Sequence, residues 1–202
     1  KAAGDTVELT VSSESAKYAG YETRKMYAGG NYAYCVQPSK KTPQSGTYEK
    51  HYDVENYVSN AGDKTQAVQS RNLAYYCWGA PGFSASYFPS TWYDGSAMDD
   101  DKYIALSHIM LSFLVSYDEV GSMHGCNSSF KNWVYQNVLG YNANGDLVNG
   151  QAPLPILCWT TAPASFKVYI LSTGSATQNI LGYEYTPTGT VSLSKTSANT
   201  GI

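Results

Sequence analysis

The run Tyr32-Ala33-Tyr34-Cys35-Val36-Gln37-Pro38 combines a strand signal with a reactive side chain. Its aromatic and β-branched residues favour an extended strand, and Pro38 ends that strand because proline cannot donate a ladder hydrogen bond. We predict one strand from Met26 to Pro38, hinged at its glycines, with Cys35 set among side chains that exclude water.

Along the whole chain the pattern changes from strands to helices and back to strands. Residues 6–11 alternate polar and apolar positions, as a half-buried strand does, and residues 39–60 are typical of a long hairpin or surface loop. Three helices are predicted next, and then three more strands. The expected helices are 65–78, 99–116 and 130–139, and the expected strands are 156–159, 165–171 and 179–185.

Strands, then helices, then strands without βαβ repeats predict an α+β fold. We expect a β-sandwich or barrel-like strand core with a helical insert at about residues 62–140, all within one domain of residues 1–186. Residues 187–202 are expected to be a linker and the first strand of a following module that has been cut away. Because Lys1 does not begin a signal peptide, the chain is expected to be an excised domain or a mature fragment.

The composition indicates an extracellular module that does not bind nucleic acid. Only 14% of the 202 residues are charged, the net charge is -3, and 19 residues are tyrosine. A basic surface for phosphate is therefore not expected. No apolar run approaches the roughly 20 residues that span a bilayer, so membrane insertion of this fragment is not expected either.

The four cysteines could bind a metal, form disulfides or remain free thiols. Without a Cys-x-x-C pair a structural zinc site is not expected, and the sequence calls for no other metal or cofactor. A buried free thiol is the default interpretation for Cys77, and Cys126 with Cys158 could form a disulfide in an oxidising compartment.

Cys35 gains significance from a glutamine far downstream, in the apolar segment Thr177-Gln178-Asn179-Ile180-Leu181. A thiol held against a side-chain amide can displace ammonia and form an internal thioester, provided that folding holds the two groups together and excludes water. A buried strand cysteine and a glutamine that satisfies backbone groups are the alternatives.

In their order along the chain, these motifs resemble those of the thioester domains of Gram-positive surface adhesins and pilus-tip proteins. Tyr34-Cys35-Val36 is similar to the family's aromatic-Cys-apolar motif, and Gln178-Asn179-Ile180-Leu181 is similar to its late glutamine motif, although Thr177 is not apolar. The resemblance implies a Cys35–Gln178 thioester. Residues 189–195 are similar to the first strand of a collagen-adhesin B-type repeat, in which Lys195 would be the isopeptide lysine.

The family's central Thr-Gln-x-Ala motif is not matched at the position where we expect it. Leu106-Ser107-His108-Ile109 takes its place on the second helix. His108 is expected on the polar-to-apolar border of that helix, where it could deprotonate an incoming amine or orient the thioester carbonyl. A helix histidine with satisfied hydrogen bonds is the alternative.

The resemblance implies a cell-wall-anchored adhesin on the bacterial surface, acting as a monomer within a multidomain protein. A lysine amine of a host-surface or extracellular-matrix protein, or another amine ligand, would attack the thioester once and leave an isopeptide bond, so the domain would not be an enzyme. Two alternatives stay open: non-covalent recognition of protein or glycan, and a cysteine hydrolase or transglutaminase-like enzyme that uses Cys35 and His108.

Overall fold

The computed structural model describes residues 4–187 and contains one six-stranded sheet with a layer of helices. The predicted α+β class is confirmed. Residues 188–202, which include the expected strand of a following module, lie outside the described residues. The strands are β1 (Thr6–Tyr18), β2 (Tyr21–Ala28), β3 (Asn31–Cys35), β4 (Gly46–Glu49), β5 (Phe166–Leu171) and β6 (Ile180–Tyr185). The α-helices are α1 (Lys64–Tyr76), α2 (Asp100–Ser116), α3 (Glu119–Ser122), α4 (Ser128–Val134) and α5 (Pro153–Leu157). Short 3₁₀ helices lie at Val54–Asn56 and Ala85–Tyr87, and a π-helical segment at Tyr135–Leu139 directly follows α4.

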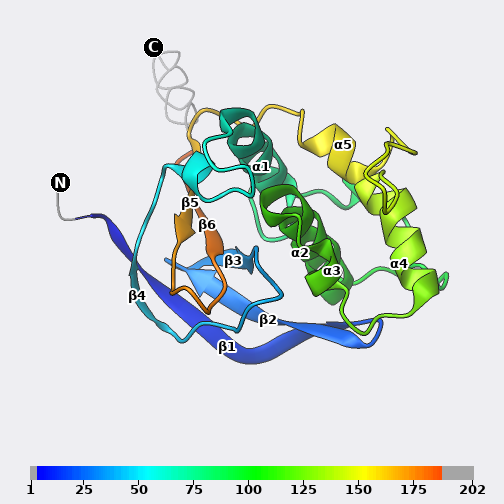
Figure 1. Cartoon of the computed structure of the whole chain (residues 1–202), viewed down its shortest axis with the longest axis horizontal. Coiled ribbons are helices and arrows are strands. Elements are labelled where there is room, and N and C mark those ends of the chain that lie inside the picture. Colours follow the sequence, from blue (N-terminus) through cyan, green and yellow to red (C-terminus); the bar gives the residue numbers. More distant parts are fainter. Residues whose placement is uncertain (1–3, 188–202) are drawn as a thin grey trace, which may run out of the picture.

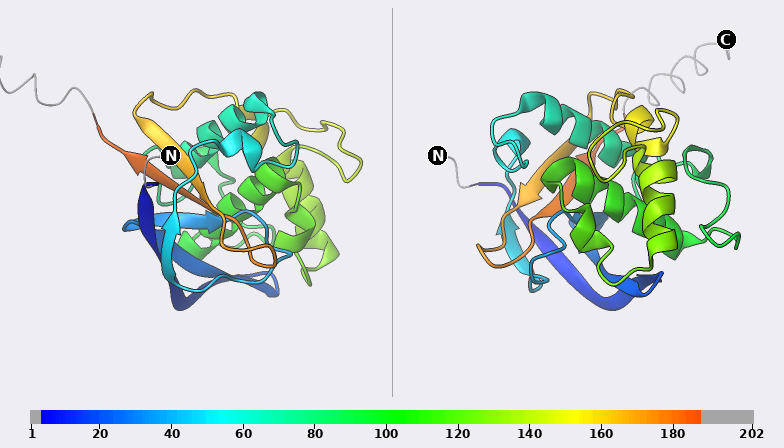
Figure 2. Two further views of the ribbon diagram at one scale, coloured as in Figure 1. Left: turned by 60° about the vertical axis from the view of Figure 1, so that its left-hand side comes forward. Right: turned by 45° about the vertical axis from the view of Figure 1, so that its right-hand side comes forward.

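The sheet is antiparallel throughout and curls into a half-barrel (Figure 1). Its strand order is β4-β1-β2-β3-β6-β5, so the last two described strands add to the early strands through the pairing of β3 with β6. Figure 2 shows β5 and β6 beside the N-terminal strands, with the helices gathered on one side. All the described helices lie between β4 and β5 in the sequence. Helices α1 to α4 fall within residues 62–140, and α5 lies after them.

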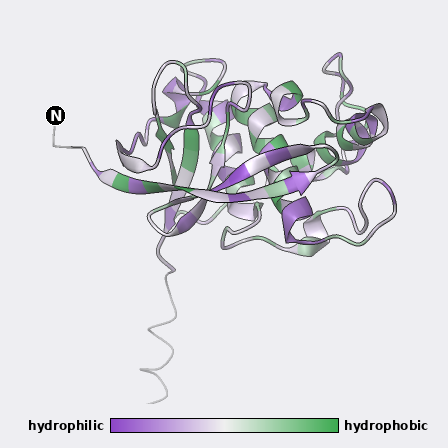
Figure 3. Cartoon of the chain, turned by 90° about the horizontal axis from the view of Figure 1, so that it is seen from below, coloured by the Kyte–Doolittle hydropathy of each residue, from purple (hydrophilic) through white to green (hydrophobic). Residues whose placement is uncertain are grey.

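Alternation along the strands divides the buried side chains between the two faces of the sheet. One face packs against the helices and carries Tyr32, Tyr34 and Val36 of the β3 region. The opposite face holds a smaller apolar cluster, hereafter the inner cluster. Its members are Leu9, Met26, Ala28, Ala33, Cys35, Tyr169, Leu171 and Ile180. Figure 3, which views the sheet from below, shows hydrophilic residues along much of the β1–β2 ribbon.

Caps at their first residues explain where the two long helices begin. Asp63 accepts a hydrogen bond from the Gln66 backbone at 3.0 Å, and Asp99 accepts one from the Lys102 backbone at 2.9 Å. These bonds satisfy amides that have no partner within the helix. Asp100 and Asp101 add negative charge to the first turn of α2, as predicted.

Two predictions about secondary structure were wrong. The segment from Met26 to Pro38 forms a hairpin of β2 and β3, because Gly29 and Gly30 both adopt positive φ (59° and 85°) and reverse the chain. Residues 156–159, predicted as a strand, belong to the end of the short helix α5 and the turn that follows it. Pro153 fits the first helical position there.

The described residues contain no helix that is long and apolar enough to cross a membrane.

Candidate functional site

The pairing of β3 with β6 brings Cys35 close to the segment that contains Gln178. Cys35 lies opposite Ile180, and the bond from the Val36 backbone N–H to the Asn179 carbonyl (3.0 Å) continues this register by one position. Gln178 lies two residues before Ile180, so strand alternation, extended past the start of β6, predicts that its side chain lies on the same side as Ile180 and diagonal to Cys35. Diagonal neighbours are within reach of a long side chain such as glutamine.

Cys35 lies in a dry environment, with only 3% of its surface exposed. Its side chain belongs to the inner cluster, on the face that points away from the helices. Burial raises the pKa of the thiol far above its usual value, and a hydrogen bond from the Gln37 backbone offsets only part of that effect. The resting side chain is therefore a neutral thiol.

Gln178 is 7% exposed, and its side-chain amide is held in one orientation. Its Nε2 donates to the Lys40 carbonyl oxygen at 3.0 Å, and this bond identifies the amide nitrogen because a carbonyl can only accept. Its backbone N–H donates to the Lys41 carbonyl, and its backbone carbonyl accepts from Thr173 Oγ1. Oε1 is buried and has no hydrogen-bond partner among the described residues.

A short loop, residues 37–41, hereafter the 37–41 loop, covers this amide. Gln37 Oε1 accepts from the Asn179 backbone at 2.8 Å, and the Lys41 backbone donates to the Ala176 carbonyl at 3.3 Å. Ser39 donates twice to the Asp118 carboxylate, from its backbone N–H at 2.8 Å and from Oγ at 2.6 Å. Backbone and side-chain hydrogen bonds therefore hold the loop both to the segment before β6 and to Asp118.

The structure also brings His108 to this site, but through the backbone of Cys35. His108 Nδ1 lies 3.2 Å from the Cys35 carbonyl oxygen, so Nδ1 carries the proton and Nε2 keeps its lone pair. Burial lowers the pKa of the imidazole to about 4. The prediction of a border position was wrong, because His108 is 1% exposed. Helix α2 packs on the face of the sheet opposite to the Cys35 side chain.

Gln66 is a buried polar residue that the sequence reasoning did not single out. It lies in the first turn of α1, where its Nε2 donates to Ser59 Oγ at 2.7 Å and to the Leu114 carbonyl of α2 at 2.9 Å. The available signal was the pair Thr65-Gln66, which is itself a Thr-Gln pair. Ser107, predicted to occupy the central motif, accepts a bond from the Trp78 backbone and also links α2 to the end of α1.

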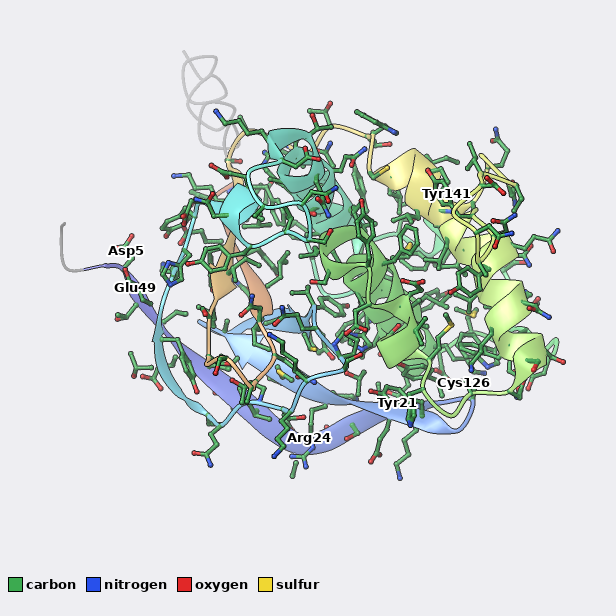
Figure 4. The ribbon with its side chains drawn as sticks, viewed as in Figure 1. Asp5, Tyr21, Arg24, Glu49, Cys126 and Tyr141 are labelled. Carbon is green, nitrogen blue, oxygen red and sulfur yellow. The ribbon has the colours of Figure 1, made fainter. Side chains whose placement is uncertain are left out.

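All four cysteines are buried free thiols, so the predicted alternative of a Cys126–Cys158 disulfide was wrong. Cys126 follows α3 and lies near Tyr21 at the start of β2 (Figure 4). Among the described residues no group of three or more His, Cys, Asp or Glu side chains is arranged to hold a metal ion.

A family model described as "Thioester domain" matches residues 6–144. The matched segment includes Cys35 and His108 but ends before Gln178, so Gln178 is assigned from the strand register. Comparisons with curated proteins and with solved structures returned no match. Since the match covers well over half of the 202 residues, the chain belongs to the thioester domain family.

Proposed function

We propose that this domain forms an internal thioester between Cys35 Sγ and Gln178 Cδ and uses it to bind an amine-bearing partner covalently. The observation that supports the proposal is the β3–β6 register, which pairs Cys35 with Ile180, two residues from the buried Gln178, so that the two side chains would be diagonal neighbours. Folding thus turns a reaction between two distant groups into a local one.

In the first step Sγ bonds to Cδ, the Cδ–Nε2 bond breaks, and the thiol proton leaves with the amide nitrogen as ammonia. Burial of the site disfavours water as a competing nucleophile. The amide oxygen of Gln178 is buried without a partner, which costs about 1–3 kcal/mol. A thioester oxygen is a weaker acceptor than an amide oxygen, so this cost falls when the bond forms.

In the second step the nitrogen of a partner's amine bonds to Cδ and Sγ leaves, taking up a proton to become the free thiol again. Sulfur is the better leaving group, because a thiol has a pKa of about 8.5 and an amine is far more basic. The product is an isopeptide bond between Gln178 and the partner. Since Gln178 stays modified, each molecule reacts once.

We assign this chemistry to an adhesin at the bacterial cell surface that captures lysine amines of host-surface or extracellular-matrix proteins. The support for the assignment is membership of the thioester domain family and a composition rich in tyrosine and poor in charge. The cell-wall anchor, the multidomain context and the monomeric state are parts of the same proposal.

Single-turnover binding is favoured over a cysteine hydrolase by the position of His108. Its protonated nitrogen contacts a backbone carbonyl, and burial keeps the Cys35 thiol neutral. A hydrolase needs a base that contacts the nucleophile. We therefore assign His108 a positioning role: it fixes the end of β3 from the helical side.

Intact mass of the native protein tests the proposal. We expect the wild-type chain to be one ammonia lighter than its sequence, and we expect Cys35→Ala and Gln178→Ala to have their full sequence masses. Methylamine should add to Gln178 of the wild type and release one thiol. Cys158→Ala is the matched control and should behave like the wild type.

A wild-type chain with its full sequence mass and a free thiol at Cys35 would refute the thioester. If a target protein then bound Cys35→Ala as tightly as the wild type, non-covalent recognition would be the function.

A further inference from the structure

We propose that the Lys40 carbonyl receives the nitrogen of the incoming nucleophile, and that the Ser39–Asp118 contact holds it there, which makes capture selective for primary amines. The inference rests on the proposed thioester and extends it to the class of amine that reacts. It names a backbone group and two positioning residues in the 37–41 loop and at the start of α3.

The first step of the argument is the position of the amide nitrogen that leaves. Gln178 Nε2 donates to the Lys40 carbonyl at 3.0 Å. The Gln178 backbone N–H donates to the Lys41 carbonyl, and the Lys41 backbone N–H donates to the Ala176 carbonyl. Ammonia therefore departs from a place defined by one acceptor. The nucleophile forms its bond to the same carbon, so its nitrogen takes that place in the product.

The second step is the hydrogen that remains on this nitrogen. A primary amine keeps one N–H after it forms the amide, and that N–H restores the bond to the Lys40 carbonyl. A secondary amine keeps none. Attack by water gives a carboxylate, which can only accept hydrogen bonds and would place an oxygen against the Lys40 carbonyl. The acceptor thus favours primary amines over both.

The third step is what fixes the acceptor. Lys40 follows Ser39, whose backbone N–H and Oγ both donate to Asp118, and bonds to a charged carboxylate are the stronger kind. The contact is tightly packed: a Cβ added at Gly121 would lie 2.5 Å from Ser39 Oγ and 2.7 Å from Asp118 Oδ1. The 37–41 loop is therefore held against the start of α3, next to the amide that it covers.

The first test needs only the wild-type protein. Methylamine and dimethylamine are added separately, the loss of thioester is followed by intact mass, and the ratio of the two rates is compared with that of a small alkyl thioester. We expect the protein to favour methylamine at least tenfold more strongly than the small thioester does, the factor that about 1.4 kcal/mol supplies. Equal ratios would overturn the inference.

The second test uses Ser39→Ala and Asp118→Ala, with Ser175→Ala in the exposed neighbouring loop as the control. We expect the first two variants still to form the thioester with loss of ammonia. Their thioester should hydrolyse about tenfold faster than that of the wild type, and their methylamine-to-dimethylamine rate ratio should approach that of the small thioester. Ser175→Ala should match the wild type. If Ser39→Ala and Asp118→Ala both keep the rate ratio and the hydrolysis rate of the wild type, the proposed role of the Ser39–Asp118 contact is wrong. If the wild type never loses ammonia, the proposed function fails together with the inference.

Discussion

At the scale of single residues, His108 shows how burial sets a side chain's chemistry. Its one hydrogen bond goes to a carbonyl oxygen, which fixes the tautomer, and its burial keeps the ring neutral at physiological pH. A neutral imidazole donates one bond to the backbone of Cys35 without placing a charge beside the thiol. We therefore expect His108 to position the end of β3 and to make the stability of the domain sensitive to acid.

The first prediction is a loss of stability on acidification that depends on His108. The folded pKa of about 4 lies below the usual 6.5, so between these values the unfolded chain binds a proton that the folded chain does not. The free energy of unfolding should therefore fall as the pH drops from 6.5 to 4, by about 3 kcal/mol from this residue. Urea unfolding at several pH values measures it.

His108→Gln is the matched control, because a glutamine amide can donate to the same carbonyl but does not titrate. Its unfolding free energy should fall less than that of the wild type over the same pH range. Parallel pH profiles for the two proteins would contradict the assignment of this acid sensitivity to His108.

The second prediction concerns Gln66, whose side chain joins α1 to the last turn of α2. Gln66→Ala leaves the Leu114 carbonyl and the Asn60 backbone N–H without this partner. We expect a loss of about 2–3 kcal/mol in the free energy of unfolding, measured in urea. Val68→Ala on the same helix is the control: Val68 is 53% exposed and should change stability by under about 0.5 kcal/mol.

The pairing of Cys35 with Gln178 stays a prediction from the sequence, based on their apolar segments and on the motifs that resemble those of the family. The role of His108 could not be predicted in the same way. Helical periodicity places it on α2, but whether it contacts the thiol or the backbone depends on which face of the sheet the helix covers. The role of the 37–41 loop could not be predicted from the sequence either, because the residues that it contacts are distant in the sequence.

At the scale of elements, the pairing of β6 with β5 requires a glycine opposite Tyr169. Gly182 lies directly opposite Tyr169, and a Cβ there would lie 2.7 Å and 2.8 Å from atoms of the phenol ring. The ring cannot move freely, because Tyr169 is 2% exposed and Lys50 Nζ lies 5.4 Å from the ring centroid. The absence of a side chain at 182 thus lets the ring close over β6.

The third prediction is that Gly182→Ala lowers the free energy of unfolding by about 1–3 kcal/mol, the usual cost of overpacking. Because Ile180 and Gln178 follow the same register, thioester formation should also be slower in this variant, as measured by intact mass after refolding. Gly46→Ala on the edge strand β4 is the control, since its added Cβ would meet only Tyr48 at 3.8 Å. Equal stability of the two variants would contradict the prediction.

The elements that could be predicted from the sequence are those with a local signal. Helices α1 and α2 have aspartate caps and apolar periodicity, and β5 and β6 are short apolar runs. Helix α5 could not be identified because Ile156-Leu157-Cys158-Trp159 is equally compatible with a buried strand. In the fold Leu154 and Leu157 are buried while Ile156 is 41% exposed, a helical spacing that five residues cannot reveal alone.

At the scale of the whole molecule, the proposed bond would close a very long loop. It would join β3 near the N-terminus of the described chain to the segment just before β6, with every described helix lying between them. A covalent link that closes a loop of more than 100 residues lowers the entropy of the unfolded chain by the equivalent of about 5 kcal/mol at 25 °C. Opening the thioester should therefore lower the stability of the folded domain as well as remove its reactive bond.

The fourth prediction follows from this link. Wild-type protein treated with methylamine should unfold at a temperature about 10–20 °C lower than untreated protein, because each 1 kcal/mol shifts the midpoint of a domain this size by about 2–4 °C. Differential scanning calorimetry measures the midpoint. Cys35→Ala, which cannot form the bond, should unfold near the temperature of the treated wild type, and methylamine should leave its midpoint unchanged. Identical midpoints for treated and untreated wild type, with the ammonia loss verified by mass, would mean that the native fold already holds β3 and β6 together as firmly as the covalent bond does.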